Sequence, residues 1–485
     1  MMKAKRKTFL SICIFMILSM LTFQMTSAQS GDYRWTAPEK LSSEDGMSSQ
    51  PSLVHDQYGY VHMFWSESGF ADGRPIIRYS RFNGETWSVP NDVFVAPEDS
   101  VIVFISPFVD SKGMLHLLWS ENNTGPLMYS RAPAYDAISA KNWIDPIPID
   151  VTSFWGDIVV DSKGVMHVLF SDYYGESQGM YYVRSENNGF SWSSPLWLDP
   201  DIPAGQGPTY VNLGIDENDG LHALWHYIDN ATANGTWIRY TNSSDGGNSW
   251  IVPITIDKAD ESYDELRLPY PEFLVAGQQV HIIWAGNSNT NREHRYSTNA
   301  GKTLSPTIRI LGDLHGQALG GGLDVDSLGR VHYATQVRSP IGIYHTYWDN
   351  GSWSIPNIAY FIGNEEVDPS NIHAHNVRLA IRAGNQVVVA FTSAPNDPQW
   401  SLYVIQTTLQ DAPEIEPLPI PTQAPVSIPT PTPTAEPVNV TTPLSPEIAS
   451  HPTEVGQPSL GIVWGIIPAL ALLGGLIVFR AVRKR

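Results

Sequence analysis

The sequence predicts an all-β protein, a seven-bladed β-propeller of four-stranded blades that is closed by an N-terminal strand. One pattern carries most of this prediction: an Asp-x-x-Gly turn, followed by an apolar strand with a histidine near its start. Seven copies, the last of them degenerate, recur at intervals of 51 to 59 residues, about the length of a four-stranded blade. Their key positions are His62, His116, His167, His222, His281, His332 and Val388.

Each repeat has room for four strands. The first strand runs into the Asp-x-x-Gly turn. The second alternates between two faces, with His116 and Leu118 on one and Leu115, Leu117 and Trp119 on the other, and a period of two is typical of a packed strand. The third strand of the first repeat covers residues 77–80, and the other repeats have similar segments. We place the fourth strand at a recurrent Trp-x-x-Pro segment, such as residues 87–90.

A Trp-x-x-Pro segment at residues 35–38 also precedes the first complete repeat. The seventh repeat ends near Leu409 without a segment of this kind. We therefore expect the N-terminal strand to complete the seventh blade, which would close the ring and remove an exposed sheet edge.

The two ends of the chain predict export and anchoring. Residues 1–28 combine a basic start, an apolar run and small residues, which is typical of a secretory signal peptide. The propeller would occupy 29–411, and residues 412–458, of which 13 are proline, would form an extended stalk. Residues 459–479 predict one transmembrane helix, followed by a basic cytoplasmic tail at 480–485. We expect a single-pass protein of the cell membrane with an extracellular propeller.

The exported part is strongly acidic. The whole chain carries a formal charge of −20, and residues 29–458 hold 21 basic against 49 acidic side chains, a balance of −28. Such a surface repels nucleic acid, so we expect no nucleic-acid partner. The single cysteine, Cys13, lies in the signal peptide, so the mature protein has no disulfide and depends on packing for stability.

A second recurrent motif lies before the Trp-x-x-Pro segment and is clearest at Ser243-x-Asp245-x-Gly247-x-x-Trp250. The aspartate can accept hydrogen bonds from its own turn, the glycine allows a positive φ, and the tryptophan can be buried between sheets. This motif resembles the Asp-box of the sialidase-like (bacterial neuraminidase repeat) β-propeller superfamily, over residues 31–410. The resemblance implies the fold and leaves the activity open, because the superfamily includes sialidases, other glycosidases, polysaccharide lyases and lectin-like modules.

The repeated histidines are expected to be structural. A catalytic base is needed once per site, whereas these six side chains recur by repeat symmetry, so we expect each to be buried and bonded to a neighbouring backbone. Residues that differ between repeats are better candidates for function. They gather on the connections between the second and third strands and between successive blades, which share one face of the ring.

The candidate ligand-binding residues lie on those connections. They are Glu67, Arg74, Asp172, Tyr173, His226, Glu265, Arg267, Tyr270, Arg292 and Arg338. No metal site is predicted, because no EF-hand or zinc spacing occurs. No cofactor is expected, although the carboxylates between Asp257 and Glu265 leave calcium open as an alternative.

The resemblance also defines what a sialidase would need: three arginines for the substrate carboxylate, a tyrosine paired with a glutamate, and an aspartate as acid–base catalyst. The Phe-Arg-Ile-Pro motif of that family is absent, and Gly73-Arg74-Pro75-Ile76 has a different order. True sialidases are also six-bladed. We therefore assign no catalytic residue from the sequence.

Two classes of function remain after these observations. The first is a surface recognition module that binds extracellular carbohydrate or a surface protein without cleaving it. The second is an exo-acting glycosidase of sialidase type or, with less support, a polysaccharide lyase using histidine and tyrosine. A convergent arginine cluster with a Tyr–Glu pair at the mouth of the central channel would favour the second class.

Overall fold

The computed structural model describes residues 33–421, except for 45, 70–72, 123–124, 174–177, 203, 233, 260–270, 287–291, 315–319, 339, 364–373 and 394–399. The signal peptide, most of the stalk, the transmembrane helix and the tail that the sequence predicts lie outside these residues. Among the described residues, no helix is both long enough and apolar enough to cross a membrane.

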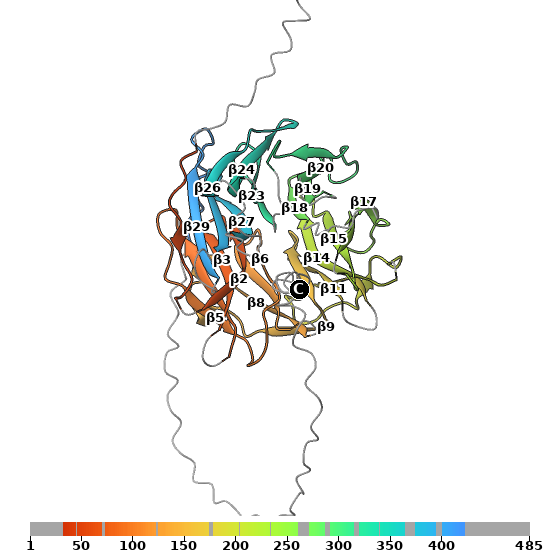
Figure 1. Cartoon of the computed structure of the whole chain (residues 1–485). Helices are drawn as coiled ribbons and strands as arrows, with labels where there is room; N and C mark the ends of the chain where they lie inside the picture. The colour runs from red at the N-terminus through yellow and green to blue at the C-terminus, as the bar shows by residue number, and fades with distance from the viewer. Residues whose placement is uncertain are drawn as a thin grey trace, which may run out of the picture. The chain divides into compact units, whose positions relative to one another are not determined.

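Seven antiparallel sheets follow one another around a ring, which confirms the all-β, seven-bladed propeller (Figure 1). The innermost strands are β2 (Met47–His55), β6 (Ile105–Val109), β10 (Trp155–Val160), β14 (Gln206–Ile215), β18 (Glu272–Ala276), β22 (Gly321–Val325) and β27 (His375–Arg382). The second strands are β3 (Val61–Ser68), β7 (Met114–Ser120), β11 (Met166–Asp172), β15 (Leu221–Asp229), β19 (Gln279–Ala285), β23 (Val331–Arg338) and β28 (Gln386–Ser393).

The outer half of each blade is more variable. The third strands are β4 (Ile76–Phe82), β8 (Pro126–Pro133), β12 (Gly179–Ser185), β16 (Gly235–Ser243), β20 (Arg292–Ser297), β24 (Ile341–Asp349) and β29 (Ser401–Thr408). The outermost strands are β5 (Asn91–Val95), β9 (Ile147–Thr152), β13 (Leu196–Trp197), β17 (Ile254–Lys258), β21 (Ile308–Ile310), β26 (Asn357–Gly363) and β1 (Glu39–Lys40), and blade 6 adds the short β25 (Ser352–Trp353). Two 3₁₀ turns in blade 2, η1 (Ala134–Asp136) and η2 (Ala140–Asn142), complete the description.

The N-terminal strand closes the ring as predicted. β1 pairs antiparallel with β29, so that Glu39 faces Val404 and Lys40 faces Tyr403. Backbone hydrogen bonds from Thr36 to Gln406 and from Leu41 to Leu402 extend the pairing on both sides. In Figure 1 the red first segment accordingly lies beside the blue β29.

The outermost strand of a blade begins after the Trp-x-x-Pro segment, so our placement of the strand in that segment was wrong. In blade 1, β5 starts at Asn91, directly after Pro90, while Trp87 packs on Phe82 with ring centroids 5.3 Å apart. Proline has no N–H to donate to a ladder, so it fits the approach to an edge strand better than its interior. The tryptophan fills space at the rim, and the residues after the proline form the strand.

The hydrophobic core lies between neighbouring blades. The second strands of blades 1, 2, 4 and 5 each bury one tryptophan almost completely, namely Trp65, Trp119, Trp225 and Trp284. A buried aromatic ring removes a large apolar area from water, which is worth roughly 25 cal/mol per Å². Stability is therefore distributed around the ring in repeated layers.

The repeated histidines are buried, as expected, but their partners are side chains and not the backbone. His62 Nε2 lies 3.0 Å from Asp56 Oδ2 at the Asp-x-x-Gly turn, and Nδ1 lies 2.8 Å from the Tyr79 hydroxyl on the third strand. The other oxygen of Asp56 accepts backbone hydrogen bonds from Tyr58 and Tyr60. One carboxylate thus fixes both its own turn and the histidine.

The same network recurs around the ring. Blades 2, 3 and 4 use Tyr129, Tyr182 and Tyr240 as the third member. Blades 5 and 6 replace the tyrosine with a second histidine, so that His281 pairs with His294, and His332 with His345. Long side chains at equivalent positions on the second and third strands can reach each other across the sheet, and this explains why the backbone is not needed as a partner.

After β29 the chain crosses the face that carries the Asp-x-x-Gly turns. This strap comprises residues Asp411–Leu418. Arg330 of blade 6 forms two hydrogen bonds with Asp411, the Ile415 amide donates to Ala383 in blade 7, and the Leu418 amide donates to Gln57 in blade 1. The strap therefore contacts the ring as far as Leu418, seven residues beyond the predicted end of the propeller at residue 411.

Candidate functional site

Two ends of the central channel have to be distinguished. The turn end carries the Asp-x-x-Gly turns and the strap. The loop end carries the starts of the innermost strands, the ends of the second strands and the starts of the third strands. Because neighbouring strands are antiparallel, these three sets of positions meet on one side of the ring, where the sequence placed the candidate ligand-binding residues.

Seven of the ten candidate residues are described. Glu265, Arg267 and Tyr270 lie outside the described residues. Arg74 is exposed, Asp172 and Tyr173 are half-buried at the end of β11, and His226, Arg292 and Arg338 are grouped around the loop end by β15, β20 and β23. Of these, Arg292 and Arg338 belong to blades 5 and 6, where the most unusual polar contacts occur.

Glu67 has a structural role in this fold. It is fully buried, and its carboxylate accepts hydrogen bonds from the Ser43 amide, the Ser43 hydroxyl and the Trp65 indole at 2.9 to 3.0 Å. Arg78 Nε also lies 3.1 Å from Glu67 Oε2. The carboxylate thereby holds the segment after β1 against blade 1, and its hydrogen-bonding capacity is used within the protein.

The loop end of blades 2 to 4 is lined by aromatic side chains, which we call the aromatic sector. Trp155 at the start of β10 stacks on Tyr210 of β14, with ring centroids 4.8 Å apart, and on Phe104 before β6, at 6.1 Å. Tyr210 also contacts His226, and Tyr173 packs on Phe154. Trp155, Tyr173 and Tyr210 remain partly exposed, so a ligand at this end would meet apolar ring surface.

The loop end of blades 5 to 7 is polar instead, and we call it the polar sector. The Tyr333 hydroxyl donates to Glu272 Oε1 at 3.3 Å, and Arg292 Nε donates to the Tyr333 oxygen at 3.2 Å. Burial raises the pKa of Glu272 to about 7, although Arg292 and Arg378 oppose the shift. Burial likewise raises the pKa of Tyr333, which disfavours its phenolate.

Arg378 connects the two sectors. It lies on β27, and burial lowers its pKa, while Glu272 and Tyr210 act in the opposite direction as neighbouring acidic groups. Groups of both sectors therefore act electrostatically on one side chain.

Three side chains of the polar sector have a buried polar atom without a hydrogen-bond partner among the described residues. These atoms are Glu272 Oε2, Gln336 Oε1 and His375 Nε2. The three side chains come from blades 5, 6 and 7, and each residue is more than 90% buried. Burial and the charge of Arg338 lower the pKa of His375 to about 3, so the imidazole is neutral at physiological pH.

The innermost strands are irregular at the same end. β2, β14 and β27 each contain a register shift, and a residue with positive φ lies within each shift: Gln50 at 53°, Tyr210 at 48° and Asn376 at 51°. This conformation is unfavourable for residues other than glycine, and bulges of this kind are concentrated near functional sites. In blades 1, 4 and 7 the repeat therefore departs from regular pairing at the loop end.

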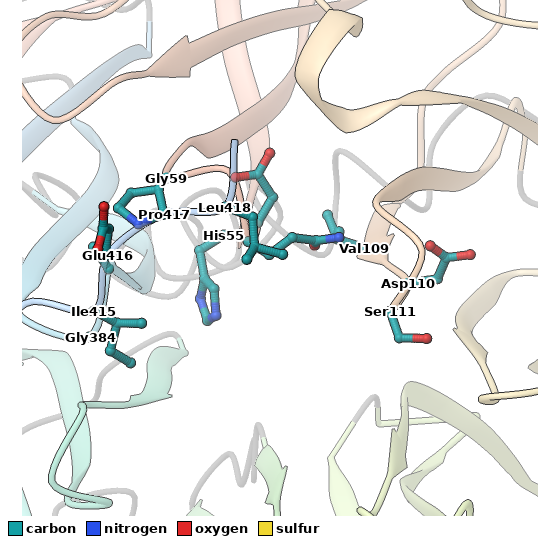
Figure 2. Close-up of a pocket in the computed structure, with 13 residues that line it drawn as sticks. His55, Gly59, Val109, Asp110, Ser111, Gly384, Ile415, Glu416, Pro417 and Leu418 are labelled. Carbon is teal, nitrogen blue, oxygen red and sulfur yellow. The ribbon is translucent and has the colours of Figure 1, made fainter. Parts of the chain in front are cut away.

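The turn end holds a cavity of about 420 Å³, shown in Figure 2. It is bounded by the turns of blades 1, 2 and 7 and by the strap, with Pro417 beside Gly59 and Ile415 beside Gly384. His55 lies at its edge and forms an ion pair at 2.9 Å with Asp324 of blade 6. No side chain that lines this cavity has an unpartnered buried polar atom, so the cavity gives less indication of a ligand than the loop end does.

The described residues contain no group of three histidine, cysteine or acidic side chains that could hold a metal ion. Asp257, the one described carboxylate of the acidic loop considered for calcium, accepts a hydrogen bond from the Trp284 indole at 2.7 Å. Calcium binding by the remainder of that loop stays a hypothesis.

Comparisons with known proteins found similarity only to solved structures. No protein-family model and no curated protein sequence matches the chain. Similar solved structures include a protein of unknown function from Dyadobacter fermentans, at 14% identity and a TM-score of 0.47, covering 78% of this chain and 99% of that one. They also include the NanB sialidase from Streptococcus pneumoniae (12% identity, TM-score 0.43, 79% and 72% covered) and a polysaccharide lyase (11%, 0.46, 80% and 95%). These similarities concern the fold alone.

Sequence reasoning missed Glu272, Tyr333 and Gln336. Glu272 begins an otherwise apolar innermost strand, and a carboxylate at such a position is a signal that could have been noticed. Tyr333 and Gln336 occupy ordinary positions of an alternating strand, and only contacts between blades distinguish them.

Proposed function

We propose that this protein is a recognition module that binds carbohydrate at the loop end of its channel without cleaving it. The observation that carries this proposal is the set of three unpartnered buried atoms, Glu272 Oε2, Gln336 Oε1 and His375 Nε2. An unpaired buried polar group costs about 1–3 kcal/mol, so three of them at the same end of neighbouring blades favour an external partner. Sugar hydroxyls both donate and accept hydrogen bonds. They would pair with these atoms after a shift of the neighbouring side chains, because each atom is enclosed in this structure.

The aromatic sector supports the same conclusion. Trp155, Tyr173 and Tyr210 present partly exposed rings next to the polar sector. Carbohydrates have polar hydroxyl edges and apolar C–H faces, and sites that bind organic ligands commonly combine apolar walls with a few convergent polar groups. A surface protein with an aromatic or amide side chain at its tip is the alternative partner in this proposal, and nucleic acid is disfavoured by the acidic surface.

The proposal also includes the location. With residues 1–28 as a signal peptide and 459–479 as a membrane helix, the propeller would be displayed outside the cell on the proline-rich stalk. Protease treatment of intact cells should then release the propeller by cutting within 422–458. Release of the propeller into the medium without protease would contradict the retained anchor.

The decisive experiment is a glycan array probed with residues 29–421, which contain the whole ring, beside the variant Gln336→Leu. We expect binding to a restricted set of glycans, and a loss of roughly tenfold in affinity in the variant because one hydrogen bond to the ligand is removed. Trp197→Ala is the matched control, since Trp197 lies on the outermost strand of blade 3 and is 46% exposed. Absence of binding to any glycan, or equal binding by Gln336→Leu, would contradict the proposal.

One observation favours a second candidate function, an exo-acting glycosidase of sialidase type. Glu272, Tyr333 and Arg292 form a Tyr–Glu pair with an arginine, and Arg378 lies nearby. Against this function, Tyr333 is completely buried and its raised pKa opposes formation of a nucleophilic phenolate. We therefore place recognition first.

A fluorogenic sialoside assay separates the two candidates. Recognition alone predicts no turnover above the uncatalysed rate. Turnover that is abolished by Tyr333→Phe and by Glu272→Gln, with binding retained, would make the protein a sialidase and overturn the first candidate. Tyr333→Phe keeps the buried ring, so a loss of activity would not result from a cavity.

A further inference from the structure

The loop end is divided by chemistry into two halves that lie on opposite arcs of the ring. Blades 2 to 4 contribute the stacked rings of Phe104, Trp155 and Tyr210. Blades 5 to 7 contribute the carboxylate, amide and imidazole atoms that lack partners.

Resting on the function proposed above, we propose that the ligand site has two subsites, one polar and one aromatic, and that it selects ligands with two rings over single sugars. The polar sector would bind one sugar ring through its hydroxyls. The aromatic sector would contact the next ring, either a second sugar or an aromatic aglycone. A monosaccharide could occupy only one of the two halves.

Tyr210 is the residue on which this selection depends. It is the only aromatic residue among the described non-glycine residues with positive φ, and it lies in the register shift of β14. In a regular strand successive side chains alternate between the two faces of the sheet. Between Thr209 and Asn212, however, β14 contains one more residue than the facing part of β15, so the alternation is interrupted at Tyr210. The ring stacks on Trp155 on one side and contacts His226 on another, so it is held in place.

The aromatic wall is positioned by packing and is therefore available before a ligand arrives. Trp155 contacts the cores on both sides of blade 3. Tyr173 is fixed by Phe154, at 5.4 Å, and lies against Gly207, where an added Cβ would come within 2.2 Å of the tyrosine ring. Preorganised rings lose little freedom on binding, which favours affinity for the second ring of a ligand.

The test uses matched pairs of methyl and p-nitrophenyl glycosides of the same sugar, for a panel of common sugars, with binding to residues 29–421 measured by calorimetry. We expect p-nitrophenyl glycosides to bind roughly three- to tenfold more tightly than their methyl counterparts, the range that an additional aromatic contact provides. Tyr210→Asn should bring this ratio close to one. Asparagine tolerates a positive φ better than most residues, so the variant removes the ring without straining the bulge.

Trp197→Ala is again the control and should leave the ratio unchanged, because this exposed ring lies at the rim of blade 3. Equal affinity for both glycosides of every sugar that binds would overturn the two-subsite inference and leave carbohydrate recognition intact. An unchanged ratio in Tyr210→Asn would also overturn it. If no glycoside of either kind binds, and the glycan array is also negative, both the inference and the proposed function fail.

Discussion

The turn end and the loop end of the propeller are built from the same seven repeats, yet the polar groups of the turn end recur from blade to blade, whereas those of the loop end differ between blades. At the turn end, histidines in the six blades that carry the network are buried and paired with side chains, and both ring nitrogens are bonded in five of them. In the sixth, His167 Nε2 lies 3.7 Å from Asp161. At the loop end, a carboxylate, an amide and an imidazole from three consecutive blades each keep an atom without a partner among the described residues. At the turn end the atoms of this kind include His167 Nε2 and the indole nitrogens of the Trp-x-x-Pro segments in blades 1, 3 and 4.

This difference indicates which residues serve the fold and which are available for a ligand. A network that recurs in six of the seven blades can be optimised for stability, because each copy links a histidine of the second strand to the third strand of its own sheet. Polar atoms that are unpaired and differ between blades are costly for the folded protein. The ring thus gains stability at the turn end and accepts unfavourable contacts at the loop end, where binding would compensate for them.

The largest effect is expected from opening the ring, on which both ends depend. Deletion of residues 33–41 removes β1 and exposes the edge of β29, together with the apolar side of blade 7. We expect loss of cooperative thermal unfolding or conversion to oligomers, measured by calorimetry and light scattering. A deletion of the same length outside the ring, within 422–458, should have no such effect. A monomer of unchanged Tm after the first deletion would contradict the closure.

Acid should affect stability through the buried histidines and through Glu272 with opposite signs. Burial lowers the pKa of His281 to about 4 and of His294 to about 2, and it also lowers those of His222, His332 and His345. Such a histidine takes up a proton only on unfolding, so stability is fully present above about pH 6.5 and is lost as the pH falls below it. His375 at the loop end acts in the same direction.

Glu272 has the opposite sign. Its raised pKa of about 7 means that the folded protein takes up this proton first, so its burial penalty decreases between about pH 7 and 4.5. We expect the Tm to fall between pH 6.5 and 4, and to fall more steeply in Glu272→Gln, in which this compensation is absent. A Tm that rises over the same interval would show that the histidine networks do not control stability.

A pair of single histidine substitutions compares the ends directly. His116→Ala removes the hydrogen-bond partner of the Tyr129 hydroxyl and of Asp110 Oδ2, so it should cost on the order of 1–3 kcal/mol in the free energy of unfolding. Ligand affinity of the folded protein should not change. His375→Phe keeps the aromatic contact with Trp400 and removes an unpartnered nitrogen, so it should cost less stability and weaken binding. The comparison would be contradicted if His116→Ala weakened binding without loss of stability, or if His375→Phe destabilised the protein without weakening binding.

The smallest effect on stability is expected for Gln336→Leu. Gln336 is 2% exposed and its amide oxygen has no partner, so replacing the amide with an apolar group of similar size should leave the free energy of unfolding unchanged or raise it by up to about 1 kcal/mol. Chemical denaturation would measure this change. A destabilisation above 2 kcal/mol would show that the amide is required by the fold and is not kept for a ligand.

The sequence by itself determined the repeated features of this protein. The number of blades, the four strands in each, the closing strand near Trp35 and the burial of His62 and its equivalents all follow from periodicity and from residues close together in the chain. A repeat displays the same local pattern many times, so even the degenerate seventh copy at Val388 could be recognised. Local patterns are sufficient here because strand pairing within a blade involves neighbouring segments.

The tertiary structure alone decided which side chains meet across blades. Glu272 and Tyr333 are 61 residues apart, and Arg330 and Asp411 are 81 residues apart, and no periodic pattern indicates that either pair is in contact. The sequence placed Glu67 among the loop-end candidates, and only the structure shows that its carboxylate accepts a hydrogen bond from the Ser43 amide. The course of the strap over the turn end likewise follows from the tertiary structure. Contacts between blades depend on how far each sheet twists and on where a bulge shifts the register. These are properties of the assembled ring, and they determine where the candidate site lies.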